Sequence, residues 1–207
     1  MPGRKASEET RREQIIKAAY EVAARRGLEG LTVRLVAAKA RLSTGLVLFH
    51  FKSKDQLVVA LLDWLLATTT VLHIGAEIRA IGAPLERLLA LLRQEMDRLS
   101  SEPMRIRLFF EFWALGGRHT RIGTKMRAEL ARYREAFRPM AVEVLEAEPE
   151  RFSQVTADGL AGVAVSFIKG CAVQSMIDPE HFDIREYLVA AEGLLGQLAP
   201  PAGSGVG

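Results

Sequence analysis

The residues with the clearest chemical purpose lie between Gly45 and Lys54, and the chemistry they suit is non-covalent recognition of a polyanion. Their spacing predicts a short helix on which Val47 and Phe51, four residues apart, point toward a core. Gly45 and Phe49, also four apart, then point to the opposite side. A glycine beside an exposed aromatic ring is unusual on a solvated helix. It suits a surface that another molecule approaches closely, such as the floor of a DNA major groove.

Two neighbouring segments are predicted to position this helix. Thr32 can begin a preceding short helix, because its hydroxyl can accept a hydrogen bond from a free backbone N–H, and apolar residues follow at helical spacing. Arg41 and Leu42 form the turn, and Ser43 can cap the helix that carries the glycine and the aromatic ring. The sequence therefore predicts a helix-turn-helix over about residues 32–51.

The charge is distributed unevenly along the chain. Residues 1–54 contain 12 Lys and Arg against 5 Asp and Glu, a balance of +7, whereas the remainder contains 16 against 20, a balance of −4. This asymmetry indicates a polyanion-binding head on a body that does not bind nucleic acid. Charge alone also suits an anionic membrane surface, and the ordered motif favours DNA.

The segment from Thr32 to Leu57 resembles the tetracycline-repressor (TetR) family of bacterial transcription regulators. The family pattern runs roughly T-V-R-x-[IV]-A, a turn, S-x-G-x-[LV]-x-[YF]-H-F and x-[ST/P]-K-[DE]-x-L, and the chain matches it in order and without a gap. The resemblance implies a helix-turn-helix head in which Gly45 allows close approach to the bases. The expected DNA-binding residues are Thr32, Arg34, Ser43, Thr44, Gly45, Leu46, Phe49, His50, Lys52 and Lys54.

Those residues are expected to play different roles at the DNA. Thr44 and Leu46 would touch base edges or thymine methyl groups, and Phe49 would pack against a sugar or a methyl group. The basic side chains would contact phosphate, which positions the protein without specifying sequence; these are Arg34, His50, Lys52 and Lys54.

The chain departs from the family pattern at three places. Leu48 and Phe49 stand where many members carry two tyrosines, so hydroxyl contacts to phosphate are lost. Leu35 replaces a frequent aspartate. Arg41 replaces the usual glycine of the turn, and it must adopt an awkward backbone angle unless the turn itself differs.

The rest of the chain reads as helices, which predicts an all-α fold of about nine helices: a three-helix helix-turn-helix head and a C-terminal helical bundle for ligand binding and dimerisation. The expected domains are a head at residues 9–69 and a body at 70–199, between flexible tails at 1–8 and 200–207. Pro139 is expected to kink or split its helix. The expected helices are residues 8–26, 33–40, 43–51, 53 into the seventies, 84 onward, 104–115, 120–146, 153–177 and 183–198.

The last two helices are predicted to form a homodimer interface. Residues 153–177 are rich in small side chains, including Gly162 and Gly170, that let another helix come close, and residues 183–198 carry Leu188, Ala191, Leu194 and Leu195 on one face. Two such helices from each of two chains would make a four-helix interface. Small residues that serve only packing within one chain are the alternative.

The helix expected at 104–115 is unusually aromatic, since four rings surround Glu111 and cover more than one of its faces. Some of these rings are expected to line an apolar pocket for a small effector, and others to belong to the core. Glu111 is either solvated or a buried acceptor for a cationic ligand. The candidate ligand-binding residues are Phe109, Glu111, Phe112, Trp113, Met126, Tyr133, Phe137 and Phe167. The stretch from Phe109 to Phe182 also loosely resembles BetI-type regulators.

Other classes of protein find little support in the sequence. There is no metal-ligand motif, nucleophile motif or Gly-rich phosphate loop, so neither an enzyme nor a cofactor is expected. The basic N-terminus is not followed by an apolar segment, the stretch Leu57–Leu72 is too short and polar for a membrane span, and Cys171 is the only cysteine. A cytoplasmic repressor is expected, which binds double-stranded DNA at a palindromic operator. An architectural DNA-binding protein without an effector is the alternative.

Overall fold

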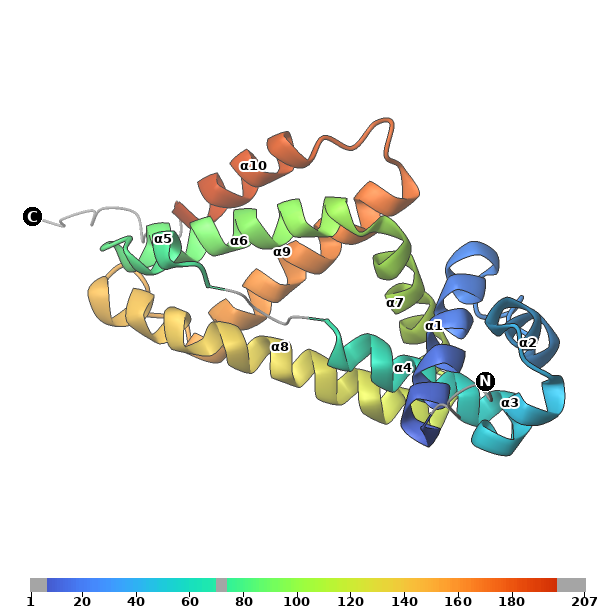
Figure 1. The fold of residues 1–207 in the computed structure, drawn as a ribbon. Coiled ribbons are helices and arrows are strands. Elements are labelled where there is room, and N and C mark those ends of the chain that lie inside the picture. The colour runs from blue at the N-terminus through green and yellow to red at the C-terminus, as the bar shows by residue number, and fades with distance from the viewer. Residues whose placement is uncertain (1–6, 70–73, 197–207) are drawn as a thin grey trace, which may run out of the picture. The chain divides into compact units, whose positions relative to one another are not determined.

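The computed structural model describes residues 7–69 and 74–196, and within these residues every regular element is a helix (Figure 1). This confirms the predicted all-α fold, with one short helix, α5, beyond the nine expected. The helices are α1 (Glu8–Arg26), α2 (Val33–Ala40), α3 (Thr44–Phe51), α4 (Lys54–Ala67), α5 (Ala76–Arg79), α6 (Pro84–Ser101), α7 (Pro103–Gly116), α8 (Thr120–Ala147), α9 (Ala157–Ile177) and α10 (Ile184–Gly196).

The chain divides into two compact units, and each is built from two separate stretches. Unit 1 comprises residues 1–70 and 104–129, and unit 2 comprises residues 71–103 and 130–207. The consecutive division into residues 9–69 and 70–199 expected from the sequence therefore differs from the compact units. The physical reason is that α7 and the first part of α8 bury Leu108, Phe112, Ile122 and Met126 in the same core as α1 to α4.

The first helix has the bounds predicted from the sequence. Ser7 caps it by accepting a hydrogen bond from the Thr10 N–H at 3.1 Å. Ile15 and Ala19, one helical turn apart, are completely buried in the unit 1 core. Gly27 ends the helix with a positive φ of 72°, a conformation that glycine adopts without steric cost.

The turn between α2 and α3 is formed by a residue in the left-handed conformation. Arg41 has φ 57° and ψ 43°, and its N–H bonds back to the Ala38 carbonyl, while that of Leu42 bonds to the Ala37 carbonyl. The turn therefore keeps the shape that glycine would give it, and Arg41 bears the steric cost.

The fourth helix is shorter than predicted. It ends at Ala67, whereas the apolar pattern suggested that it continues into the seventies; residues 70–73 lie outside the described residues. The Leu65 carbonyl accepts the Thr69 hydroxyl at 2.6 Å, and the Trp64 carbonyl accepts the Thr68 hydroxyl at 2.7 Å beside the Thr68 N–H at 3.0 Å. Such local side-chain bonds compete with continuation of the helix.

An arginine from α7 secures this end of α4. Arg105 donates to the Leu65 carbonyl at 2.8 Å and to the hydroxyls of Thr68 and Thr69, and its guanidinium lies 5.7 Å from the centre of the Trp64 ring. Carbonyls left free at a helix C-terminus are commonly satisfied by a basic side chain. Arg105 therefore fixes the point at which α4 ends against α7.

Unit 2 is built from α5, α6, α9, α10 and the later part of α8. Its core includes Leu88, Phe137, Ala164 and Ile168, all fully buried. α8 is one uninterrupted helix, so the prediction that Pro139 splits it is wrong. Pro139 lies on the exposed side of α8, where water can replace the lost backbone bond.

The boundaries of the last two helices differ slightly from the prediction. α9 begins at Ala157 and not at Ser153, because the hydroxyl of Thr156 accepts the Gly159 N–H at 3.1 Å and so caps the helix there. Before α10, an Asp183 carboxylate oxygen accepts the Arg185 N–H at 2.7 Å, and the predicted last two residues of this helix, 197 and 198, lie outside the described residues.

The helix with the longest apolar window among the described residues is α9. It is the one described helix long and apolar enough to cross a membrane, with a mean hydropathy of 1.6 over 18 residues, of which 39% are buried. Core helices of soluble proteins pass the same test. Much of its apolar surface packs into the unit 2 core, including Leu160, Val165 and Ile168.

The unit 2 core also contains a carboxylate that the sequence pattern did not reveal. Glu95 is completely buried, and its Oε2 atom accepts hydrogen bonds from the Tyr133 hydroxyl at 2.6 Å and from the Arg98 guanidinium at 2.7 Å. Burial, together with this neighbouring carboxylate, raises the pKa of Tyr133. The amine of Lys169 lies 4.4 Å from the centre of the Tyr133 ring. Glu95 thus has its charge compensated inside the unit.

Candidate nucleic-acid interface

The outer face of α3 combines open backbone with an exposed aromatic ring. Phe49 is 64% exposed, whereas Val47 and Phe51 on the opposite face are 0% and 2% exposed. A Cβ added to Gly45 would meet nothing nearer than the Ser43 hydroxyl at 4.0 Å, so the backbone there is accessible. This arrangement agrees with the two faces predicted from the spacing.

Two of the expected contact residues also cap helices. The hydroxyl of Thr32 accepts the Leu35 N–H at 3.2 Å, and that of Ser43 accepts the Leu46 N–H at 3.1 Å. Because each hydroxyl oxygen accepts in its cap, its own proton remains able to donate to a phosphate. A single hydroxyl can therefore order a helix start and bind an anion.

Contacts from α1 hold the recognition helix in place, and the sequence pattern did not predict them. Arg12 donates to the His50 carbonyl at 2.6 Å, and its guanidinium lies 4.5 Å from the centre of the Phe51 ring. Gln14 donates to the Ala40 carbonyl at 2.8 Å. These contacts satisfy carbonyls at the ends of α3 and α2. No periodic pattern announces them, since the partners lie 38 and 26 residues apart.

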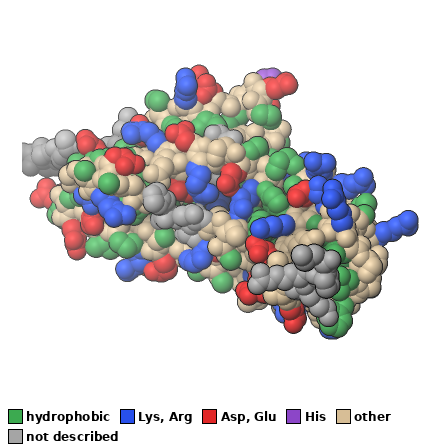
Figure 2. Space-filling model, in the orientation of Figure 1, with side chains coloured by type: hydrophobic (Ala, Val, Ile, Leu, Met, Phe, Trp, Pro, Cys, Tyr) green, Lys and Arg blue, Asp and Glu red, His purple; other side chains and the backbone are tan. Residues whose placement is uncertain are grey.

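Several cations surround this face. Arg34, Lys52 and Lys54 are exposed, and the Lys52 amine lies 5.1 Å from the centre of the Phe49 ring. Lys39, by contrast, pairs with Glu21 of α1. In the view of Figure 2, Lys and Arg side chains gather over α1 and α2. Such a concentration of positive charge favours phosphate contacts.

The structure brings the ten expected DNA-binding residues onto three neighbouring segments. Thr44 is exposed on the first turn of α3, Leu46 is half-buried, and His50 has a buried Nδ1 atom without a hydrogen-bond partner among the described residues. The basic N-terminal residues Arg4 and Lys5 lie outside the described residues. The segments are the start of α2, the whole of α3 and the start of α4.

The expected ligand-binding residues fall into two groups. Phe109, Glu111, Phe112, Trp113 and Met126 belong to unit 1, where Phe112 is completely buried and Trp113 is 40% exposed. Tyr133, Phe137 and Phe167 belong to unit 2. Glu111 does not stand alone in solvent, because it accepts the Leu28 N–H.

An all-helical chain with a helix-turn-helix and an exposed, cation-rimmed recognition helix has the architecture of a DNA-binding transcription regulator. Two family models match it: "Bacterial regulatory proteins, tetR family" over residues 15–61, and "BetI-type transcriptional repressor, C-terminal" over residues 84–200. The chain belongs to the TetR family, with a C-terminal region of the BetI type. It is a transcriptional regulator with a helix-turn-helix and not an enzyme.

Similar proteins support this assignment over nearly the whole chain. The transcriptional regulator BetI of Burkholderia mallei is 26% identical, with 93% of this chain and 95% of that protein covered. A transcriptional regulator from Rhodococcus sp. Rha1 shares the fold with a TM-score of 0.69 at 21% identity, covering 90% of this chain and 95% of the other. A regulator from Saccharomonospora viridis, solved in complex with choline, has a TM-score of 0.68 at 17% identity over the same shares.

Proposed function

We propose that the protein is a dimeric repressor that binds a palindromic operator and is released from it by a small effector. The observation that carries the proposal is the outer face of α3, where accessible backbone at Gly45 adjoins the exposed Phe49 ring. A helix with this face can enter the major groove closely enough for Thr44 and Leu46 to touch base edges. Arg34, His50, Lys52 and Lys54 would hold the phosphates on either side. The head is residues 9–69, and the body is 70–199.

An exposed apolar face on α9 and α10 supports dimerisation. Val163 and Ile177 of α9 are 41% and 71% exposed, and Val189 and Leu194 of α10 are 70% and 60% exposed. Large apolar side chains grouped at such exposures favour association with another surface. A Cβ added to Gly162 would meet nothing within 4 Å, so a partner helix could approach closely there.

Fewer residues of α9 and α10 are available for a dimer interface than the sequence suggested. Ala161, Ala164 and Ala172 are buried within unit 2, as are Ala191 and Leu195 of α10. These small side chains therefore pack inside one chain, as the alternative to a dimer interface requires. The residues proposed for the interface are the exposed Val163, Ile177, Val189, Gly193 and Leu194, together with the half-buried Gly162.

Dimerisation gives the head its specificity. A single short helix contacts only a few base pairs, so two copies related by a two-fold axis are needed to read a palindrome with half-sites spaced by about 34 Å or more. A change in the spacing of the two recognition helices would then weaken binding to the operator.

An apolar or amphiphilic effector is supported by the aromatic side chains of the C-terminal region. On α7, the rings of Phe110 and Trp113 stack with centroids 5.7 Å apart, and Phe109 meets both edge-on. Rings of this kind bind apolar surface and cations alike. We propose that the effector binds better to a conformation whose heads are wrongly spaced, which couples its binding to DNA release.

Selection from random duplexes, followed by footprinting of the recovered site, tests the proposal. We expect a palindromic site, a dimer in sedimentation experiments, and loss of the footprint with one member of a small-molecule panel that includes choline. Equal affinity for all duplexes, or no release by any compound, would favour an architectural DNA-binding protein. A monomer at operator-binding concentrations would contradict the proposed interface.

A further inference from the structure

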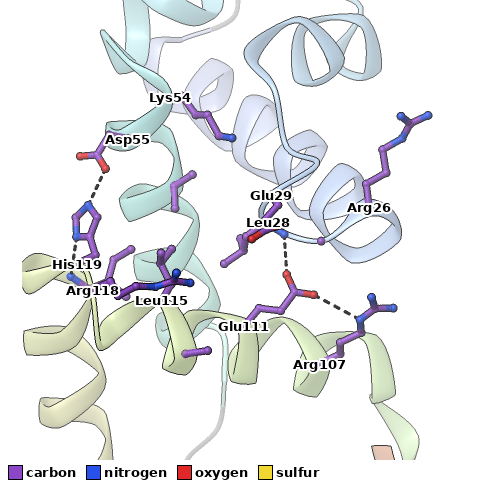
Figure 3. A pocket seen from close by; sticks show the side chains of 14 residues that line it. Arg26, Leu28, Glu29, Lys54, Asp55, Arg107, Glu111, Leu115, Arg118 and His119 are labelled. Carbon is purple, nitrogen blue, oxygen red and sulfur yellow. Dashed lines mark hydrogen bonds and ion pairs between the residues drawn. The ribbon is translucent and has the colours of Figure 1, made fainter. Parts of the chain in front are cut away.

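Unit 1 contains a cavity of about 720 Å³ that shares only Lys54 with the expected DNA-binding residues. It lies between the loop after α1, the first turns of α4, residues 107–115 of α7 and the start of α8 (Figure 3). Its volume falls in the range of small-molecule sites. Of the residues expected to bind ligand, only Glu111 lines it.

Two of the three carboxylates that line this cavity are already engaged by the protein. The Glu111 carboxylate accepts the Leu28 N–H at 2.6 Å and lies 3.4 Å from the Arg107 guanidinium. The Asp55 carboxylate lies 2.7 Å from Nε2 of His119. The third, Glu29, is exposed. Glu111 and Asp55 are therefore both held by partners within the wall, and Glu29 is left open to solvent.

Three cations of the lining, Arg26, Lys54 and Arg118, form no ion pair among the described residues. Lys54 and Arg118 are both exposed, and neither forms an ion pair there. Figure 3 shows Lys54 at the top of the view, across the cavity from Glu111, and Arg118 at the lower left, beside Leu115. Arg26 also lines the cavity, but its guanidinium points away from it (Figure 3). The cavity therefore offers two unpaired cations, Lys54 and Arg118, besides the exposed carboxylate of Glu29.

The remaining wall is apolar. Leu28, Val58 and Ile122 are buried residues of the unit 1 core whose surfaces line the cavity, together with Ala114 and Leu115 of α7. A ligand that fits this wall has an apolar chain, and a ligand that fits the two free cations has an anionic head. A carboxylate group can bond to an arginine through both of its oxygens.

We propose that this cavity is a second ligand site, which takes a small carboxylate with a short apolar chain. Arg118 and Lys54 hold the carboxylate, and Leu28, Val58 and Leu115 cover the chain. Lys54 is also an expected phosphate contact, so the bound carboxylate competes with the DNA backbone for the same amine. An occupied cavity therefore weakens DNA binding through Lys54, independently of an effector bound at the aromatic rings of α7.

Calorimetric titration of the full-length protein with octanoate, in the absence of DNA, tests the site directly. We expect saturable binding that weakens about tenfold in Arg118→Glu, because a charge-assisted hydrogen bond is replaced by repulsion. Arg118→Gln should weaken it less. Arg121→Glu is the matched control, because Arg121 is exposed on the first turn of α8, three residues after Arg118, and does not line the cavity, and octanoate should bind it as it binds the wild type.

A control ligand of opposite charge and a DNA-binding experiment distinguish this site from non-specific binding of octanoate to other surfaces. Octylammonium, with the same chain and the opposite charge, should not compete with octanoate. Octanoate should lower affinity for a random-sequence duplex at low salt in wild type and Arg121→Glu, but not in Arg118→Glu. Without octanoate, Arg118→Glu and Arg121→Glu should bind the duplex equally, which shows that Arg118 is not itself a phosphate contact.

Three results would overturn the proposal. Octanoate could bind Arg118→Glu and the wild type with the same affinity, which would place it elsewhere. Octylammonium could displace octanoate, which would remove the role of the cations. Octanoate could fail to bind at all, and since this titration contains no DNA, that result would leave the proposed repressor function intact.

Discussion

The Oε2 atom of Glu111, in α7, accepts a hydrogen bond of 2.6 Å from the backbone N–H of Leu28, in the loop between α1 and α2. The two residues are 83 positions apart in the chain. The adjacent Gly27 has a positive φ, and a Cβ placed there would lie 3.1 Å from the same oxygen. This bond satisfies a partly buried N–H just before the helix-turn-helix, and it ties α7 to the loop that leads into it.

Removal of that carboxylate should destabilise the protein. Glu111→Ala leaves the Leu28 N–H without its acceptor, and we expect the free energy of unfolding in urea to fall by about 1–3 kcal/mol. Glu111→Gln keeps an acceptor oxygen and should lose less. Glu135→Ala, an exposed position on α8, is the control and should change stability by less than about 0.5 kcal/mol. Equal stability of Glu111→Ala and the control would show that the bond contributes nothing.

The two faces of α3 should respond oppositely to truncation of a phenylalanine. Phe49→Ala removes an exposed ring, so DNA affinity should fall about tenfold while the melting temperature stays nearly constant. Phe51→Ala empties part of the core and should reduce the free energy of unfolding by about 3–5 kcal/mol. Duplex binding by fluorescence anisotropy and thermal unfolding measure the two effects. Full DNA affinity in Phe49→Ala would exclude that ring from the interface.

Lys54 should contribute to DNA binding through charge alone. Lys54→Ala should weaken binding to every duplex and reduce the slope of log K against log salt concentration by about one unit. Arg134→Ala, which removes an exposed cation from α8, should leave the slope unchanged. Titrations at several salt concentrations give the slope, and an unaltered value in Lys54→Ala would remove this residue from the phosphate contacts.

The left-handed turn residue offers a test of backbone strain. Arg41→Gly should raise the free energy of unfolding by about 1 kcal/mol, because glycine adopts a positive φ without a clash between Cβ and the backbone. Arg41→Ala removes the same charge but keeps the Cβ, so it should bring no such gain. Urea unfolding of the two variants decides the question, and equal stabilities would mean that the strain is negligible.

The buried tyrosine predicts how stability changes in alkali. The pKa of Tyr133 is raised in the folded protein by burial and by Glu95, so above its ordinary value of 10.0 the unfolded chain loses this proton first. Below pH 10 the raised pKa of Tyr133 makes its full contribution to the free energy of unfolding. Above pH 10 this contribution falls by up to about 1.4 kcal/mol per pH unit.

Urea unfolding of wild type and Tyr133→Phe between about pH 8 and pH 11 isolates this contribution. The variant lacks the hydroxyl that donates to Glu95, so it should be less stable at neutral pH and should decline less steeply in alkali. Parallel curves for the two proteins would contradict the assignment to Tyr133.

Local chemistry explains which parts of the fold could be predicted. The bounds of α1, the caps at Thr32, Ser43 and Ser53, and the inward and outward faces of α3 all follow from residues within one or two turns of each other. The end of α4 was predicted too late, because it depends on hydroxyl bonds and on Arg105, 40 residues away from the Leu65 carbonyl that it binds.

The same limit applies to the candidate DNA-binding site: features set by neighbouring residues were predictable, and contacts with distant residues were not. A periodic pattern identifies the exposed residues Gly45 and Phe49, but it carries no information on which distant side chain holds the helix. The donation from Arg12 to the His50 carbonyl therefore has no counterpart in the sequence pattern. Likewise, the small residues of α9 could not be divided between inner and outer packing until the positions of Ala161 and Gly162 relative to the unit 2 core were known.

Because unit 1 is built from two separate stretches of the chain, its DNA-binding helices cannot be exchanged between regulators as one continuous segment. A transferred segment that ends after α4 contains the recognition helix. It lacks Leu108, Phe112 and Ile122, the core residues against which α1 and α4 pack. In a chimaera joined at that point, α1 to α4 of one regulator would have to pack against α7 and the start of α8 of another. Successful transplantation of DNA specificity should instead move α1 to α4 together with residues 104–129, or change only the outer side chains of α3.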